Sequence, residues 1–439
     1  MSKNITKPSI LPGFMELTPK EQVAFNHVYD VIRKNYESFG FLPIDTPIIE
    51  KSEVLLAKTG GDTEKQIYTL TKGSTEMALR FDLTVPLARY VAQHMEDIAF
   101  PFKRYQIGKV YRGERNQRGR FREFYQCDVD IIGNGELNII NDAQIPSIIY
   151  KIFTELGFKN FKIRLNNRKI LDGFLKNLNI DSYTEVLRTV DKIDKIGKEK
   201  IEEELKSYID DEEAVNAIIE FITIKGSNDE KIKSLRNMNI SNERFVEGVT
   251  ELEEVNKYIK VFGIPDENYV IDFKITRGLD YYTGTVYETF LDDYPEFGSV
   301  CSGGRYDNLA QFYTEKKLPG VGISIGLTRL FWSFMESNII DLNKNSLIDV
   351  LVIPMDDDYE YSIKICNELR ENGIKADIYL EGGKFAKKMK YANKLNVSRV
   401  IIIGENERQE NKILLKRMES GEQELLSIEQ GINFIKGYK

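Results

Sequence analysis

The sequence has 439 residues, a length typical of about three domains. Apolar residues make up 41% of it and charged residues 30%, which excludes a chain that is disordered throughout. Lysine and arginine number 61 against 69 aspartate and glutamate residues, and the net charge of −8 argues, as an average, against a nucleic-acid partner.

The small numbers of histidine and cysteine residues argue against several further kinds of site. Two histidines, His27 and His94, leave little material for a histidine-rich metal site or a Ser-His-Asp triad. Cys127, Cys301 and Cys366 form no CxxC pair, which argues against a zinc knuckle or a disulfide framework and is typical of a reducing compartment. No run approaches the roughly 18 apolar residues of a membrane helix, and the N-terminus lacks an apolar signal region. We therefore expect a cytoplasmic protein with no membrane segment.

The first predicted element is a helix over residues 19–39, where apolar residues recur at helical spacing. Thr18 and Glu21 form a T-x-x-E capping box, and Gly40 is a natural stop. Residues 41–50 are predicted to be extended, and their two prolines favour an edge or interface strand.

Residues 100–132 predict a two-stranded ribbon, because polar and apolar residues alternate on both sides of a turn. Between Lys103 and Glu123 there are eight basic and two acidic residues, a local net charge of +6. Arginines on rigid strands can hold phosphate oxygens bidentately, and Phe124 could stack on a base. For the ribbon alone, an exposed hairpin with a solvated charged face is the commoner case.

Residues 181–260 have a helical pattern, are rich in Glu and Lys, and are poor in Gly and Pro. This composition predicts a separate helical insertion with a solvated surface. The insertion holds 13 basic and 20 acidic residues, a net charge of −7, so the rest of the chain carries only −1. Read by segment, the charge leaves room for a basic nucleic-acid path beside an acidic appendage.

Strand patterns return at 269–290, 298–304 and 320–326, and the last of these leads into a helix. A polar linker at 337–346 follows. The remainder alternates as β-α-β-α-β, which predicts a small α/β domain with a mostly parallel sheet.

The segment GVGISIG (320–326) contains a GxG, but its glycines alternate within an extended run and do not form the turn of a dinucleotide fingerprint. Gly320, Gly322, Ser324 and Gly326 should share one face, against which a flat ring could lie beside Arg329. Close strand packing is the alternative. A Walker A motif is absent, which removes the usual P-loop route to ATP.

Two further groups of polar residues suit a small ligand. In LRFDLTVPLARY (79–90), Asp82 and Thr84 lie on one side of an extended stretch, and Asp82 could pair with an ammonium, although a lone Asp more often caps a helix or lies on the surface. In TRGLDYYTGTVYE (276–288) and SVCSGGRYDNL (299–309), one cation and three phenols could grip a polar molecule: Arg277, Tyr281, Tyr282 and Tyr306.

Together these segments resemble the histidyl-tRNA synthetases, a family of class II aminoacyl-tRNA synthetases, along essentially the whole chain. Pro47 stands at the place of the motif 1 proline at the family's dimer interface. VYRGERNQRGRFREF resembles motif 2, and GISIGLTRL resembles motif 3. RGLDYYTGTVYE and CSGGRYD resemble the two stretches that separate histidyl enzymes from other class II synthetases.

The resemblance implies an α+β fold, in which a mostly antiparallel sheet with flanking helices forms the catalytic domain over 1–336, interrupted by the helical insertion 181–260. It implies an anticodon-binding α/β domain over 347–439 and a homodimer. The activity implied is a histidine–tRNA ligase that uses ATP and Mg²⁺ to charge tRNA(His). No metal ligand is assigned to a protein side chain.

The resemblance also implies residue roles. Arg112 and Arg277 would be catalytic, with Arg112 contacting the α-phosphate and the histidine carboxylate. The ATP site would comprise Arg112, Glu114, Arg120 at the γ-phosphate, and Phe124 and Arg329 on the two faces of adenine. The histidine site would comprise Asp82, Leu83, Thr84, Arg112, Gln126, Asp130, Arg277, Tyr281, Tyr282 and Tyr306.

Two rivals and two open points accompany this interpretation. A catalytically silent relative, such as the regulatory subunit of ATP phosphoribosyltransferase, generally lacks both the RGLDYY stretch and the anticodon-binding domain, and a class II enzyme for another amino acid lacks the histidine-specific segments. Thr328 stands where an acidic residue is expected before the motif 3 arginine. The Lys-rich helix predicted at 384–394, with a net charge of +5, either lies near the anticodon stem-loop or is an ordinary solvated face.

Overall fold

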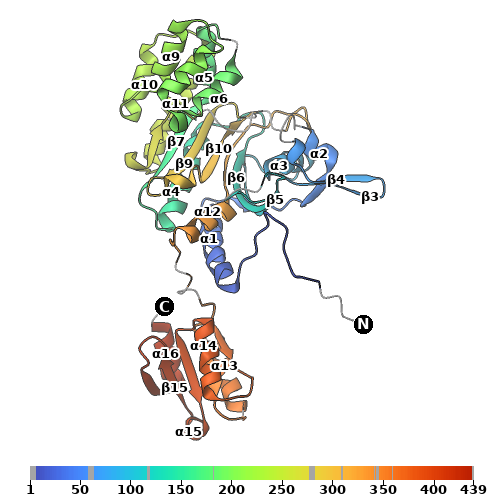
Figure 1. Ribbon diagram of the computed structural model, residues 1–439, viewed down its shortest axis with the longest axis vertical. Helices are drawn as coiled ribbons and strands as arrows, with labels where there is room; N and C mark the ends of the chain where they lie inside the picture. The colour runs from blue at the N-terminus through green and yellow to red at the C-terminus, as the bar shows by residue number, and fades with distance from the viewer. Residues whose placement is uncertain are drawn as a thin grey trace. The chain divides into compact units, whose positions relative to one another are not determined.

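The protein is described by a computed structural model, in which the chain folds into two compact units (Figure 1). One unit comprises residues 1–15 and 28–337, and the other comprises residues 16–27 and 338–439. The structure describes residues 6–57, 64–115, 119–180, 182–275, 282–307, 310–340, 342, 346–357 and 359–437. Within these ranges, none of the helices combines the length and apolar character needed to cross a bilayer.

The first unit is built on an eight-stranded sheet. Every neighbouring pair in it is antiparallel except the first and the last pair. The strands follow the order β1 (Leu42–Pro43), β5 (Phe102–Tyr111), β6 (Glu123–Ile132), β11 (Gly320–Ile325), β10 (Cys301–Tyr306), β9 (Thr285–Leu291), β7 (Phe161–Asn167) and β8 (Tyr269–Ile271). The predicted α+β fold with an antiparallel sheet is confirmed, as are the ribbon β5–β6 and the edge position of β1.

Helices flank this sheet, and a smaller sheet lies beside it. The flanking helices are α1 (Pro19–Ser38), α3 (Thr84–Gln93), α4 (Ile140–Glu155), α5 (Arg168–Asn177) and α12 (Leu327–Glu336), and short 3₁₀ turns occupy Glu64–Gln66, Asp266–Asn268 and Pro295–Phe297. The smaller sheet has the order β2 (Ile49–Lys51), β4 (Thr75–Leu79), β3 (Thr69–Lys72), and α2 (Ser52–Leu56) follows β2. Helix α1 starts as predicted, because the Glu21 carboxylate accepts hydrogen bonds from the Thr18 N–H and hydroxyl, each at 2.7 Å. It stops at Gly40, whose φ is +79°.

Strand alternation divides the sheet into two faces. On β10, the odd-numbered Arg305 points to α4, where its guanidinium lies 2.7 Å from the Asp142 carboxylate. The next residue, Tyr306, points to the opposite face, where its hydroxyl donates to Asp130 at 3.0 Å. Because side chains on a strand alternate between faces, the even-numbered residues of β6, β10 and β11 share the face away from α4.

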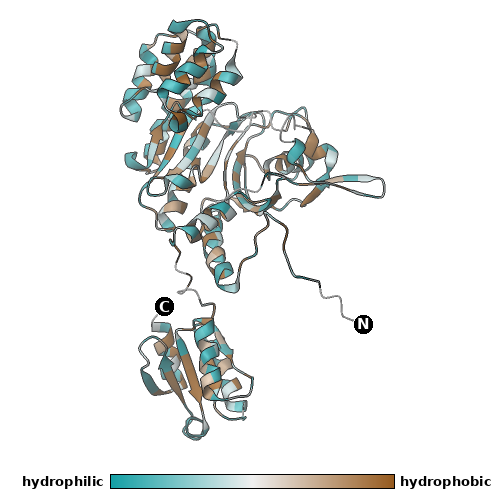
Figure 2. Ribbon diagram, in the orientation of Figure 1, coloured by the Kyte–Doolittle hydropathy of each residue, from teal (hydrophilic) through white to brown (hydrophobic). Residues whose placement is uncertain are grey.

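The helical content predicted for residues 181–260 is confirmed, and these helices belong to the first unit, where α11 packs against α5 and α4 (Figure 1). The helices are α6 (Tyr183–Val190), α7 (Ile193–Ile196), α8 (Lys198–Lys206), α9 (Glu212–Ile222), α10 (Asn228–Asn237) and α11 (Glu243–Val261). Gly173 of α5 and Gly248 of α11 let the two backbones approach closely: a Cβ on Gly248 would lie 2.8 Å from the Ile170 nitrogen. Lys169 fastens the crossing through ion pairs with Glu247 at 2.8 Å and Glu251 at 2.5 Å. Figure 2 shows hydrophilic residues on the outer faces of these helices.

The second unit corrects one expectation. Its sheet has the order β13 (Ala376–Ile378), β12 (Val350–Pro354), β14 (Arg399–Ile403), β15 (Lys412–Arg417), β16 (Gln423–Ser427), with helices α13 (Glu360–Glu371), α14 (Phe385–Leu395), α15 (Glu405–Gln409) and α16 (Ile428–Gly437). The β-α-β-α-β stretch forms the parallel half, as predicted. The sheet is not mostly parallel, however, because β15 and β16 extend it by two antiparallel pairings. The connections from β14 to β15 and from β15 to β16 are short, and strands joined by a short connection pair antiparallel.

Candidate active site

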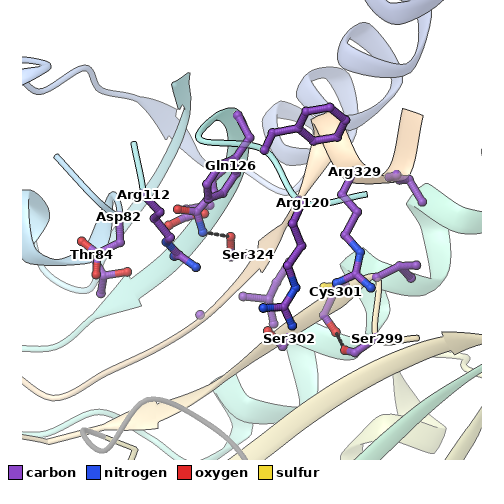
Figure 3. Close-up of a pocket in the computed structure, with 18 of the residues that line it drawn as sticks. Asp82, Thr84, Arg112, Arg120, Gln126, Ser299, Cys301, Ser302, Ser324 and Arg329 are labelled. Carbon is purple, nitrogen blue, oxygen red and sulfur yellow. Dashed lines mark hydrogen bonds between the residues drawn. The ribbon is translucent and has the colours of Figure 1, made fainter. Parts of the chain in front are cut away.

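A cavity of about 390 Å³ opens on the face of the large sheet that lies away from α4 (Figure 3). Strands β6, β10 and β11 supply its floor. The loop before α3, the ribbon turn and the start of α12 supply its walls. Segments from distant parts of the chain therefore meet at one site.

Cross-strand register arranges residues of β5 and of the floor strands in two rows. In the first row, Arg104 on β5, Asp130 on β6 and Gly322 on β11 are direct neighbours. In the second, the neighbours are Gln106, Asp128, Ser324 and Ser302. Directly opposed residues on one face lie within about 4.5–5.5 Å of each other at Cβ, so each row is a continuous set of contacts.

The first row carries a buried ion pair. Arg104 is fully buried, and one of its guanidinium nitrogens lies 2.6 Å from Asp130 Oδ2. The Tyr306 hydroxyl donates to Asp130 Oδ1 at 3.0 Å. Burial raises the pKa of Asp130, whereas the Arg104 charge and the Tyr306 hydrogen bond lower it. Both oxygens of Asp130 are therefore engaged by the protein itself.

The second row contains a second carboxylate, Asp128, and the effects that raise its pKa outweigh those that lower it. Burial raises the pKa of Asp128 to about 7, and the charges of Asp130 and Asp82 act in the same direction. Arg104 and a hydrogen bond from Ser324 oppose this rise. Asp128 is therefore poised to change its protonation state near neutral pH.

The glycines of β11 make room for these groups. A Cβ on Gly320 would lie 2.5 Å from the Tyr306 ring, and one on Gly322 would overlap the Asp130 carboxylate. Gly322, Ser324 and Gly326 also line the cavity. Close packing is therefore confirmed for GVGISIG at Gly320 and Gly322, where Tyr306 and Asp130 fill the space on the same face. That a flat ring lies against this strip stays a prediction.

Cations gather at the other end of the cavity. Arg112 Nε donates to the Phe81 carbonyl at 3.0 Å, and its guanidinium lies 5.1 Å from the centre of the Phe124 ring. Arg120 and Arg329 lie side by side in Figure 3. Burial and the charge of Arg120 lower the pKa of Arg329, so the two guanidiniums repel each other when no anion lies between them. This end suits a polyanion.

Asp82 caps the first turn of α3 and also lines the cavity, and its pairing with a ligand ammonium stays a prediction. Its Oδ1 accepts from the Val85 N–H at 3.0 Å in the first turn of α3, and its side chain lines the cavity next to Thr84 and Arg112 (Figure 3). Gln126 belongs to β6 and also lines the cavity, and its Nε2 donates to Ser324 Oγ at 2.8 Å. Among the described residues, no group of three or more His, Cys, Asp or Glu side chains is arranged to hold a metal ion.

Most of the predicted site residues meet at this cavity. The lining includes Asp82, Thr84, Arg112, Glu114, Arg120, Phe124, Gln126, Asp130, Tyr282, Tyr306 and Arg329. Leu83 is fully buried and is not part of the lining. Arg277 and Tyr281 fall outside the described residues.

Comparisons with known proteins agree with this geometry. A family model described as histidyl-tRNA synthetase matches residues 13–330, and one described as an anticodon binding domain matches residues 349–438. A histidine–tRNA ligase of Clostridium tetani is 61% identical over 99% of this chain and 100% of its own length. The chain belongs to the histidyl-tRNA synthetase family.

Further relatives extend this assignment. A histidine–tRNA ligase of Clostridium acetobutylicum is 54% identical over 97% of this chain and 99% of its own length. A crystal structure of histidyl-tRNA synthetase from Nostoc sp. PCC 7120 matches with a TM-score of 0.91 and 39% identity over 99% of this chain and all of that one. A Bacillus halodurans structure titled as an ATP phosphoribosyltransferase regulatory subunit/histidyl-tRNA synthetase covers 91% of this chain and all of that one, with a TM-score of 0.76 and 20% identity, which shows a shared fold alone.

The departure at Thr328 from the histidyl-tRNA synthetase pattern has a structural explanation. Thr328 is buried, and its hydroxyl accepts from the Tyr125 N–H at 2.8 Å. The hydroxyl thus ties the start of α12 in motif 3 to strand β6 in motif 2. Since Arg329 follows directly, this bond also fixes the segment that presents Arg329 to the cavity.

Sequence reasoning missed Asp128 as part of the floor and Arg104 as the buried partner of Asp130. Arg104 was counted only as one of the ribbon cations, although it is fully buried. A signal existed for Asp128, because Gln126, Asp128 and Asp130 occupy alternate positions of one predicted strand and must share a face.

The Lys-rich helix α14 is only partly a charged surface. Lys388 is buried, and its ammonium donates to the Pro354 carbonyl at 2.6 Å. The other four lysines of the predicted set, Lys384, Lys387, Lys390 and Lys394, are exposed. One of the five charges therefore holds the α/β unit together and is not available to a partner.

Proposed function

We propose that the protein is a histidine–tRNA ligase. It activates L-histidine with ATP to give histidyl-adenylate and pyrophosphate, and then transfers the histidyl group to the 3′ end of tRNA(His). Family membership supports this, and one observation carries it to these residues: a single cavity joins a carboxylate-lined floor to a cationic rim. Such a cavity suits a cationic amino acid beside a polyphosphate.

The rim forms the ATP site in this proposal. Arg112 contacts the α-phosphate, Arg120 reaches the γ-phosphate, and Phe124 and Arg329 lie on the two faces of adenine. Glu114, whose carboxylate lies 3.3 Å from Arg120, holds that guanidinium in place. The mutual repulsion of Arg120 and Arg329 supports this assignment, because bound phosphates would relieve it.

The floor and the α3 wall form the histidine site. Asp82 and Thr84 hold the α-ammonium, whereas Gln126, Asp130 and Tyr306 surround the imidazole. Tyr282 closes this end of the cavity, and Leu83 contributes its backbone. Arg277 and Tyr281 are assigned to the same site by the family motif.

The reaction steps follow from where the charged side chains of the site lie. An oxygen of the histidine carboxylate attacks the α-phosphorus of ATP in line. A bond forms between this oxygen and the phosphorus, the bond from the phosphorus to the bridging oxygen breaks, and pyrophosphate leaves. Negative charge on the phosphate oxygens is stabilised by Arg112, which the Phe81 carbonyl holds in place, and by Arg277. Mg²⁺ bound with ATP would neutralise part of the phosphate charge, and no side chain of the described residues is assigned to hold it. A ribose hydroxyl at the 3′ end of the tRNA then attacks the histidyl carbonyl, and AMP leaves.

The remaining assignments complete the proposal. Residues 1–336 form the catalytic domain around the insertion 181–260, and residues 347–439 bind the anticodon region of the tRNA. The protein works in the cytoplasm as a homodimer whose interface includes Pro47.

Amino-acid-dependent exchange of pyrophosphate into ATP tests the proposal. With a panel of twenty amino acids, histidine alone should support exchange, and total tRNA should then be charged with histidine only. Exchange with a different amino acid would overturn the substrate. No exchange with any amino acid would favour a catalytically silent regulatory subunit.

A further inference from the structure

The single tryptophan of the chain, Trp332, lies on α12 outside the cavity lining and packs against the ribbon turn. Its six-membered ring covers Gly119, because a Cβ on that glycine would lie 3.0 Å from the ring. The φ of Gly119 is +72°, in the left-handed region that favours glycine. The Trp332 ring also meets the Phe121 ring edge to face, with 6.4 Å between the ring centres. Trp332 therefore contacts the residue on each side of Arg120.

Arg120 lies in a segment that the large sheet does not hold. The ladder between β5 and β6 ends with the pair Tyr111 and Glu123, and Arg120 lies beyond it. Its guanidinium is 3.3 Å from the Glu114 carboxylate, but 56% of its side chain is exposed, and so exposed an ion pair contributes little. Burial and the charge of Arg120 lower the pKa of Arg329, which lies beside it in Figure 3. Contacts that do not depend on charge therefore have to keep Arg120 at the cavity.

Helix α12 offers a rigid base for such a contact. Its Phe331 and Phe334 side chains are fully buried, and the Thr328 hydroxyl accepts a hydrogen bond of 2.8 Å from the backbone of β6. Arg329 precedes Trp332 by three residues, so the two side chains are neighbours on the helix surface. One helix thus presents the first rim cation directly and packs on the segment that carries the second.

We propose that Trp332 is a positioning residue for the γ-phosphate of ATP. By packing on the residues at both sides of Arg120, its ring keeps that guanidinium beside Arg329 before the nucleotide binds. ATP then meets two cations that are already in place and does not have to bring them together against their repulsion. The inference rests on the proposed function, in which Arg120 reaches the γ-phosphate.

The affinity for ATP relative to that for AMP tests this role, because both nucleotides carry adenine and the α-phosphate and only ATP carries the γ-phosphate. Trp332→Leu should weaken ATP binding by roughly three- to tenfold, the factor that one aromatic contact is typically worth. AMP binding should stay within about twofold of wild type. Isothermal titration calorimetry in the absence of histidine measures both dissociation constants. Damage to the adenine end of the site would weaken both nucleotides alike.

A double-mutant cycle shows whether the ring acts through Arg120. Arg120→Met should weaken ATP by roughly ten- to hundredfold and AMP by less than about twofold, because a charged hydrogen bond to the γ-phosphate is lost. Adding Trp332→Leu to Arg120→Met should change ATP affinity by less than about twofold, because no cation remains to be held. Phe334→Leu is the matched control on the same helix, since its ring packs on Phe158 with 5.1 Å between the ring centres. It should lower the melting temperature and leave the ratio of the ATP and AMP dissociation constants unchanged.

Three results would each overturn the proposal: an unchanged ratio in Trp332→Leu while Arg120→Met changes it, an equal loss for both nucleotides, or a full effect of Trp332→Leu in the Arg120→Met background. If Trp332→Leu does not fold, Trp332→Phe, which keeps a smaller ring, is held to the same criteria. If Arg120→Met itself leaves the ratio unchanged, the γ-phosphate assignment of the proposed function is wrong, and the inference falls with it. Failure of the Trp332 variant alone leaves the proposed function standing.

Discussion

The two ends of the cavity hold their charges in opposite ways. At the floor, Arg104 and Asp130 form a fully buried pair at 2.6 Å, and the Tyr306 hydroxyl completes it. At the rim, Arg120 is half exposed, with 56% of its side chain accessible, and lies close enough to Arg329 to lower the pKa of that guanidinium. The floor is preorganised by the protein's own charges, whereas the proposed function has the rim completed by the charge of a bound phosphate. Because of this difference, we expect substitutions at the floor to lower stability and substitutions at the rim to lower activity.

The largest effect should come from breaking the floor pair. Arg104→Met leaves the Asp130 carboxylate buried without its cation, and we expect the free energy of unfolding to fall by about 3–5 kcal/mol. Chemical denaturation of the first unit measures this. Arg305→Met is a matched control, because Arg305 forms a similarly buried pair with Asp142 on the other face of the sheet. Both variants should be destabilised, but only Arg104→Met should also lose histidine affinity; an equal loss in Arg305→Met would contradict the difference between the faces.

At the rim, the expected loss is in rate and not in stability. Arg112→Ala should reduce histidine-dependent pyrophosphate exchange by roughly 10²–10³-fold, as is typical when one preorganised charge donor is removed. Arg277→Ala should behave alike if the family motif places it correctly. Lys109→Ala serves as the control, since this ribbon lysine pairs with Glu123 and does not line the cavity. Near-normal pyrophosphate exchange in Arg112→Ala would contradict the catalytic role assigned to Arg112.

The pH dependence of stability sharpens the comparison at Asp128. Its folded-state pKa of about 7 lies above the ordinary value of 3.8, so the folded protein binds the extra proton between these values. Stability should therefore fall as the pH rises from about 4 to 7, and Asp128→Asn should remove that fall. At pH 8 the variant should exceed wild type by on the order of 2–4 kcal/mol. Denaturation curves at pH 5 and pH 8 measure the difference, and equal slopes against pH in both proteins would refute the assignment.

The smallest effect concerns the lysines of α14. Replacing Lys387, Lys390 and Lys394 by Gln should reduce the salt dependence of tRNA binding by about two in its logarithmic slope, if these residues meet phosphates. A control set in the same unit is Lys364, Lys412 and Lys436. Unchanged affinity and slope in the α14 variant would identify the helix as an ordinary solvated face.

Local patterns predicted much of the fold. The capping box at Thr18, the alternation in β5 and β6 and the helical composition of the insertion all depend on neighbours in sequence, and all are confirmed. The second unit shows where such patterns end, because β15 and β16 complete its sheet through pairings that no local period announces.

The same limit holds for the site, because local patterns identify some of its residues and tertiary contacts are needed for the others. Motif residues were found because they lie in recognisable segments, whereas the burial of Arg104 and Lys388 depends on what packs around them. A charged residue on an amphipathic element is usually exposed, and only tertiary contacts identify the exceptions. Asp128 could have been found from strand alternation, but the burial that raises its pKa is visible only in three dimensions.

The central claim is that one cavity holds histidine at its floor and ATP at its rim, side by side. Calorimetric titration with a non-hydrolysable histidyl-adenylate analogue tests it most directly. The account predicts tight binding of one analogue per chain, with prior saturation by either histidine or ATP weakening it. An analogue that competes with only one of the two substrates would contradict the claim.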